Sequence, residues 1–123
     1  MKRILLVDDN ESFRRPLAET LQRAGYEVES VGDGSTALKL FGQTPYDLVI
    51  TDLIMPGKEG LETIVELRRL EPDLKIIAIS GGGRISPQDY LPMARQLGAA
   101  VAMAKPFTAQ EILEAVAKLL AAG

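Results

Sequence analysis

The chain has 123 residues, of which 46% are apolar and 25% are charged, as is typical of one globular domain. It has no cysteine and no histidine, which excludes disulfides, thiolate or imidazole metal ligands and a Ser-His-Asp catalytic triad. The net charge of −3 argues against nucleic acid as the main partner, and no apolar run approaches the roughly 18 residues of a membrane span, so we expect a cytoplasmic protein.

The first part of the chain alternates strand and helix signals. Residues 4–7 are all apolar, which predicts a strand buried on both faces of a sheet. Residues 10–24 repeat apolar side chains every three or four positions, which predicts a helix with Asn10 as its N-terminal cap. Pro16 conflicts with this helix because proline lacks a backbone N–H, so the helix either begins late or bends there. Residues 26–31 alternate apolar and polar side chains, which predicts a half-exposed edge strand.

The remaining elements continue the same alternation. Short apolar runs predict buried strands at residues 48–50 and 76–79 and a weaker strand at 99–104. Apolar spacing and capping residues predict helices around residues 37–41 and 61–67, a helix beginning at Ser86 and a helix over 108–122. In chain order, these helices and strands alternate. A capping box, Thr108-Ala109-Gln110-Glu111, opens the last of these helices.

Five consecutive strand–helix units predict an α/β fold, with a five-stranded parallel sheet and five helices on its two faces. A closed barrel of this kind needs eight units and about twice this length. The remaining candidate is an open, doubly wound sheet of the flavodoxin-like type in strand order 2-1-3-4-5. Its binding crevice lies at the carboxyl ends of the strands, and the first and third strands are neighbours there.

Polar residues follow the predicted strands at this edge. Asp8 and Asp9 follow the first strand and Asp52 the third, while Ser80 and Lys105 follow the fourth and fifth. Each of these residues alone is more often a cap, a turn or a surface side chain, but their joint placement favours a site. Three converging carboxylates repel one another and need a cation, and oxygen ligands without His or Cys select Mg²⁺. A carboxylate nucleophile with an ion, an ammonium and a hydroxyl can accept a phosphoryl group.

With these motifs the chain resembles a receiver domain of bacterial two-component response regulators, of the chemotaxis-regulator type. The resemblance covers essentially the whole chain and is carried by residues 4–9, residues 47–52, Met55-Pro56 with Gly60, Ser80, and Lys105-Pro106-Phe107. It implies a phosphoacceptor signalling switch, with self-catalysed phosphotransfer and autodephosphorylation, and not a turnover enzyme. We expect a single receiver domain over residues 1–123 with no output domain, either as a stand-alone protein or as a piece of a longer one.

The resemblance also implies a role for each site residue. Asp52 is the expected phosphoacceptor, and Lys105 and Ser80 are expected to bind the phosphoryl oxygens. The peptide bond from Lys105 to Pro106 is expected to be cis, as in the family. The resemblance places Mg²⁺ on a set of four residues, namely Asp8, Asp9, Asp52 and the backbone carbonyl of Ile54.

The expected phosphoryl donor is a phosphohistidine on a sensor histidine kinase or a histidine phosphotransfer protein, because this chain has no histidine. On phosphorylation Ser80 moves, and the surface of the fourth helix, fifth strand and fifth helix changes and controls binding of an unknown downstream protein. We expect no direct nucleic acid or membrane partner. A monomer or a phosphorylation-dependent dimer is expected.

One position departs from the family pattern. The usual switch aromatic lies three residues before the lysine, where this chain has Ala102, and a methyl group cannot report movement of Ser80 by swinging inward. The glycines at residues 81–83 either carry the conformational response in its place or form only a mobile turn. Tyr90 is either a substitute aromatic or a packing residue.

Three other functions are alternatives. An aspartyl-phosphate phosphatase of the haloacid-dehalogenase type needs a second acid two residues after the nucleophile, where this chain has Ile54. A flavodoxin-like cofactor carrier needs a phosphate-binding loop after the first strand, where Asp8 and Asp9 would repel a phosphate. A pseudo-receiver scaffold would not need the complete set of site residues.

Overall fold

The computed structural model describes residues 1–53, 60–80, 92, 95, 96 and 98–121. Its elements in chain order are β1 (Arg3–Val7), α1 (Glu11–Arg23), β2 (Glu27–Val31), α2 (Gly34–Gln43), β3 (Leu48–Asp52), α3 (Gly60–Leu70), β4 (Lys75–Ser80), β5 (Val101–Ala104) and α5 (Ala109–Ala121). The predicted start of the fourth helix at Ser86 lies outside the described residues, as do Ile54, residues 81–83 and Tyr90, whereas Pro92, Arg95 and Gln96 are helical. The predicted start of the last strand is wrong by two residues, because β5 begins at Val101.

All five strands are parallel and lie in the order β2-β1-β3-β4-β5, which confirms the predicted topology. The strand at residues 27–31 is an edge strand, as its alternating pattern predicts. The register pairs Val7 of β1 with Thr51 of β3. Asp8, which directly follows β1, and Asp52, the last residue of β3, therefore lie next to each other at the same edge of the sheet.

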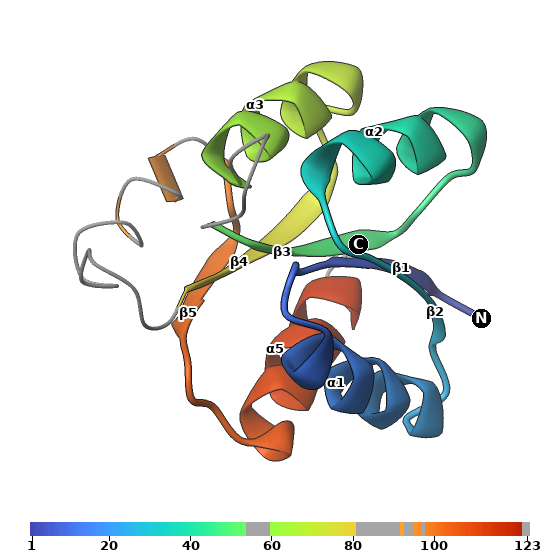
Figure 1. Ribbon diagram of the computed structural model, residues 1–123, viewed down its shortest axis with the longest axis vertical. Coiled ribbons are helices and arrows are strands. Elements are labelled where there is room, and N and C mark those ends of the chain that lie inside the picture. Colours follow the sequence, from blue (N-terminus) through green and yellow to red (C-terminus); the bar gives the residue numbers. More distant parts are fainter. Residues whose placement is uncertain (54–59, 81–91, 93–94, 97, 122–123) are drawn as a thin grey trace.

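Helices cover both faces of the sheet, with α1 and α5 on one side and α2 and α3 on the other (Figure 1). Successive residues of β1 therefore enter two separate cores. Leu5 packs in the cluster that contains Ile64 of α3, whereas Leu6 packs in the cluster that contains Leu21 of α1 and Ile112 of α5. Burial on both faces explains why β1 shows no polar alternation. Within the described part of the chain, no helix combines the length and the apolar character needed to cross a membrane.

The helix N-terminal caps predicted at Asn10 and Thr108 are present, and the cap predicted at Ser86 lies outside the described residues. The Asn10 side chain accepts a hydrogen bond from the Phe13 N–H at 3.3 Å and so caps α1. Thr108 and Glu111 form a reciprocal capping box at the start of α5, with distances of 2.9 and 3.1 Å. Helix α1 runs from Glu11 to Arg23 through Pro16, so the alternative of a late helix start is wrong.

Asp33 caps α2, and its effect on stability is expected to depend on pH. Its carboxylate accepts bonds from the Thr36 N–H at 2.7 Å and the Thr36 hydroxyl at 3.0 Å. The bond from the Thr36 N–H, helped by the hydroxyl, lowers the Asp33 pKa below its ordinary value of 3.8. The stabilisation by the charged cap is therefore complete above that value and is lost as the pH falls through the lower pKa of the folded state.

We expect Asp33→Ala to lower the free energy of unfolding by about 1 kcal/mol at neutral pH, the usual value of a cap residue. The loss should become smaller as the pH falls below 3.8, because the wild-type cap is then also losing its charge. Urea unfolding of both proteins across this pH range measures the difference. Asp33→Asn is the matched control, because an amide oxygen still accepts the Thr36 bond. If the difference in unfolding free energy between the wild type and Asp33→Ala does not change with pH, the charge of Asp33 does not contribute to stability.

Candidate functional site

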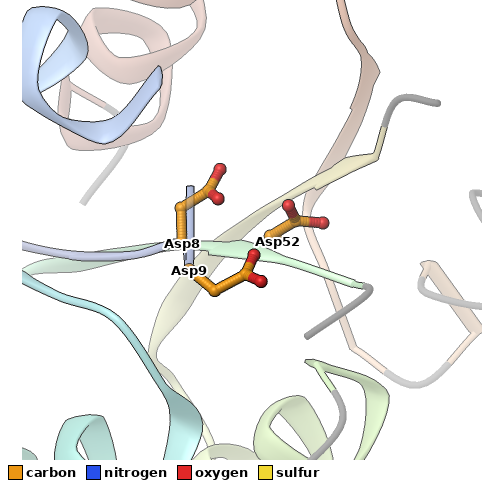
Figure 2. A group of neighbouring side chains, drawn as sticks. All are labelled: Asp8, Asp9 and Asp52. Carbon is orange, nitrogen blue, oxygen red and sulfur yellow. The ribbon is translucent and has the colours of Figure 1, made fainter. Parts of the chain in front are cut away.

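Three carboxylates meet where β1 and β3 end (Figure 2). Asp8 and Asp9 directly follow β1, Asp52 is the last residue of β3, and one oxygen from each lies within 4.8 Å of the other two. Asp8 is fully buried and Asp52 is 6% exposed, whereas Asp9 is exposed to solvent. The structure thus brings together the three acids that the sequence places at this edge.

The buried Asp8 carboxylate is held by two donors. Its Oδ1 atom accepts a hydrogen bond from the Asn10 N–H at 2.9 Å, and its Oδ2 atom accepts one from the Lys105 Nζ at 2.8 Å. The Asp8 backbone carbonyl accepts a further bond from Arg14 Nη1 at 2.7 Å. A buried charge is costly unless it is paired and hydrogen-bonded, and these contacts meet both conditions. They also fix the direction in which the carboxylate points.

Lys105 is the cation of the site. Its Nζ atom lies 2.8 Å from Asp8 Oδ2, 3.1 Å from Asp52 Oδ2 and 4.0 Å from the centre of the Phe13 ring, and its side chain is 16% exposed. Burial lowers the Lys105 pKa, but the hydrogen bond to Asp8 and the charge of Asp52 together outweigh burial and raise it above 10.5. The ammonium therefore remains charged at neutral pH, and its pairing is lost only in the alkaline range. The bond between Lys105 and Pro106 is cis, as predicted.

Ser80 supplies a buried hydroxyl. It is the last residue of β4 and is fully buried, and its Oγ atom has no hydrogen-bond partner among the described residues. Its backbone carbonyl accepts a bond from the Lys105 N–H at 2.8 Å, so the ends of β4 and β5 are joined at this point. A buried hydroxyl without a partner costs about 1–3 kcal/mol, and such groups are commonly found where a ligand supplies the acceptor.

The charge and chemistry of this donor set fit Mg²⁺. Among the described residues, three carboxylates face the ammonium of Lys105, and the Arg14 guanidinium contacts the Asp8 backbone, so negative charge is in excess and a divalent cation would offset it. The three side chains offer only oxygen atoms as metal ligands, and hard ions such as Mg²⁺ prefer oxygen ligands. Mg²⁺ commonly binds to one or two carboxylates together with phosphate oxygens. The fourth ligand predicted from the sequence, the carbonyl of Ile54, lies outside the described residues.

Two neighbours of the site were not identified as site residues from the sequence. The sequence pattern accounts for Phe13 only as part of the apolar stripe of the first helix, yet its ring lies against the ammonium of Lys105. Arg14 is the next residue, and its side chain reaches the Asp8 backbone. Both residues lie in the first turn of the helix that follows Asp8 and Asp9, and side chains in that turn lie close to the end of β1. This position in the sequence could have identified them as neighbours of the site.

A model of the response regulator receiver domain matches residues 4–117, nearly the whole chain. The chain belongs to this family. Receiver domains are signalling proteins and not classical enzymes; they generally use Mg²⁺ and are phosphorylated by histidine kinases or phosphotransfer proteins. This membership favours the receiver function over the phosphatase and cofactor-carrier alternatives.

Two curated relatives are similar over nearly their whole length. The chain is 33% identical over 124 residues to the response regulator receiver protein CpdR of Brucella abortus, covering 99% of each chain. It is 31% identical to sporulation initiation phosphotransferase F of Bacillus subtilis, covering 97% of this chain and 94% of the relative. Other relatives are longer, and the chain spans between 24% and 52% of their length.

Among solved structures, the response regulator TrrA of Thermotoga maritima, in complex with Mg²⁺-BeF, superposes with a TM-score of 0.85 at 39% identity, covering 97% of this chain and 99% of TrrA. A receiver domain from Clostridium thermocellum superposes with a TM-score of 0.90 at 27% identity, covering 98% of this chain and 94% of that protein. Both comparisons agree with the strand order of this receiver domain.

Proposed function

We propose that this receiver domain accepts a phosphoryl group on Asp52 from a phosphohistidine of a partner kinase or phosphotransfer protein. The observation that carries the proposal is the position of the Asp52 carboxylate, which lies 3.1 Å from the Lys105 ammonium and in one cluster with Asp8 and Asp9. A carboxylate placed between a fixed cation and further acidic ligands is arranged to act as a nucleophile toward phosphorus.

In the proposed reaction a carboxylate oxygen of Asp52 attacks the phosphorus atom. An oxygen–phosphorus bond forms while the bond from phosphorus to the imidazole nitrogen of the donor breaks. The imidazole leaves with that electron pair and takes up a proton from solvent. Lys105 pairs with one phosphoryl oxygen, and the Ser80 hydroxyl, which is buried at the same edge, donates to another.

The proposed metal ligands are Asp8, Asp9, Asp52 and the carbonyl of Ile54. When bound, Mg²⁺ supplies charge neutralisation for the phosphoryl oxygens. Asp8 is held by Asn10 and Lys105, so it offers a preorganised position, while the exposed Asp9 is free to meet an ion that arrives from solvent. The same site would hydrolyse the acyl phosphate slowly, so the protein's own chemistry is limited to phosphotransfer and autodephosphorylation.

The proposed output is a change of binding surface. Ser80 ends β4 and its backbone is bonded to Lys105, so movement of Ser80 toward a phosphoryl group acts directly on the end of β5. The surface of β5, α5 and the segment before β5 would then bind a downstream protein or a second phosphorylated copy. Ala102 lies within β5 at the position of the family's usual aromatic, so this receiver needs another route of coupling.

The direct test is phosphorylation by acetyl phosphate. We expect the intact mass of the protein to rise by one phosphoryl group when acetyl phosphate and Mg²⁺ are present, and not when the metal is removed with EDTA. Hydroxylamine should reverse the gain, because it cleaves acyl phosphates but not phosphate esters of serine or threonine. A protein that gains no mass, or whose added mass resists hydroxylamine, would contradict the proposal.

A further inference from the structure

We propose that Phe13 is a positioning residue for Lys105, and this inference rests on the proposed function. The Lys105 Nζ atom lies 4.0 Å from the centre of the Phe13 ring, well within the distance of about 6 Å at which an aromatic face attracts a cation. Asp8 and Asp52 contact the same ammonium at 2.8 and 3.1 Å. Two carboxylates and one aromatic face thus enclose the cation that would meet the phosphoryl oxygens.

The ring of Phe13 is tied to the acidic cluster through the backbone. The Asp8 carboxylate accepts a bond from the Asn10 N–H, and the Asn10 side chain accepts a bond from the Phe13 N–H at 3.3 Å. Lys105 then connects the Phe13 ring back to the other oxygen of Asp8. Asp8, Asn10, Phe13 and Lys105 thus form a closed ring of contacts. A shift of any one of these residues is resisted by the other three.

A second aromatic residue fixes the orientation of this ring. Phe107, two residues after Lys105, packs edge-to-face against Phe13 with ring centres 5.7 Å apart and planes at 89°. Such pairs add stability beyond the area that they bury. The Phe13 ring is therefore held from α1 through its own backbone and from the chain after β5 through Phe107.

The aromatic contact differs from the two ion pairs in one respect. Asp8 and Asp52 belong to the acidic set that fits Mg²⁺, so a metal and Lys105 would share the same two carboxylates. The face of Phe13 offers no oxygen and is not shared with a metal. It continues to hold the ammonium in place when the charge of the carboxylates is shared with an ion, and it covers the cation against water.

The test compares Phe13→Leu, which keeps apolar bulk but has no ring, with Phe13→Tyr, which keeps the ring. We expect Phe13→Leu to slow uptake of the phosphoryl group from acetyl phosphate by about 2- to 30-fold, the range that cation–π contacts span. Phe13→Tyr should restore a rate close to that of the wild type. Phe41→Leu is the matched control, because Phe41 is a half-buried aromatic stacked on Tyr46 and lies in the other core.

A second readout does not depend on phosphorylation. Acetylation of Lys105 by a dilute amine-reactive ester, followed by peptide mass mapping, is compared with acetylation of the exposed Lys118 on α5. We expect the Lys105 to Lys118 ratio to rise several-fold in Phe13→Leu and to remain at the wild-type value in Phe13→Tyr and Phe41→Leu. If circular dichroism shows Phe13→Leu to be unfolded, Phe13→Met, which also has no ring, carries the same expectation.

The two readouts separate this inference from the proposed function. If the wild type takes up phosphoryl groups and Phe13→Leu matches it in rate or in the acetylation ratio, the positioning role is overturned while the proposed function stands. If the wild type takes up none, the proposed function fails, and an unchanged acetylation ratio then overturns the contact as well. Slower uptake with a raised ratio, both restored by Phe13→Tyr, supports the inference.

Discussion

Replacement of Asp52 by asparagine is expected to lower the rate of phosphoryl uptake from acetyl phosphate by a factor of at least about 10². An amide has the shape of the carboxylate but carries no negative charge and is a poor nucleophile toward phosphorus. Its oxygen still accepts a bond from Lys105, which lies 3.1 Å from the wild-type carboxylate, so the site keeps its geometry. Intact mass measured over time with Mg²⁺ present gives the rate for both proteins.

A matched control separates the loss of this carboxylate from the loss of any negative charge. Asp73→Asn removes an exposed acid from the turn between α3 and β4, outside the cluster, and should keep the wild-type rate. Circular dichroism should show Asp52→Asn to be folded. A mass gain that persists in Asp52→Asn would place the phosphoacceptor on another residue, with Asp9, the exposed acid of the cluster, as the next to be replaced.

The sequence alone predicts the sheet and the three acids of the site, and the physical reason is local. A short apolar run without alternation, such as residues 4–7, is typical of a strand buried on both faces, and β1 does contribute to both cores. The succession of five strand–helix units then favours a parallel sheet covered by helices on both sides. Once the strand order is known, the residues at the carboxyl ends of β1 and β3 are expected to lie close together, because the ends of neighbouring parallel strands lie at one edge.

The sequence does not predict how the acids differ. Asp8 and Asp9 are adjacent and chemically identical, yet Asp8 is fully buried and Asp9 is exposed. The positive charge that pairs with the buried Asp8 is that of Lys105, which lies 97 positions further along the chain. A contact over that distance in sequence depends on the packing of the whole sheet, and no local pattern contains it.

The contact between Lys105 and the Phe13 ring cannot be predicted from the sequence for a related reason. Phe13 fits the apolar stripe of α1, and this pattern accounts for its presence without any role in the site. The helix nevertheless starts at Glu11 and continues through Pro16, and this early start places Phe13 in the first turn, near the strand ends. A late start of the helix, one of the two alternatives that Pro16 leaves open, would have moved the ring out of the first turn.

Addition of Mg²⁺ is expected to raise the melting temperature of the protein. A ligand that binds only the folded state, at a free concentration about ten times its Kd, adds about 1.4 kcal/mol to the free energy of unfolding. For a domain of this length that corresponds to an increase of about 4–8 °C. Thermal unfolding followed by circular dichroism, with and without Mg²⁺ at matched ionic strength, measures the shift, and no shift at millimolar Mg²⁺ would contradict the metal site.

Asp9→Asn makes this prediction specific to the acidic cluster. Asp9 is exposed and Asp8 is not, so replacing Asp9 removes a charge without leaving the half-buried Lys105 unpaired. Since the three carboxylates outnumber the cations that contact them in the described part of the chain, Lys105 and Arg14, the variant without metal should melt at or above the wild-type temperature. With Mg²⁺ the wild type should melt at the higher temperature, because it gains the binding free energy of the ion whereas the variant has lost a ligand. Asp73→Asn should show the same increase in melting temperature with Mg²⁺ as the wild type. An Asp9→Asn protein that gains as much from Mg²⁺ as the wild type would show that the ion does not bind at the strand ends.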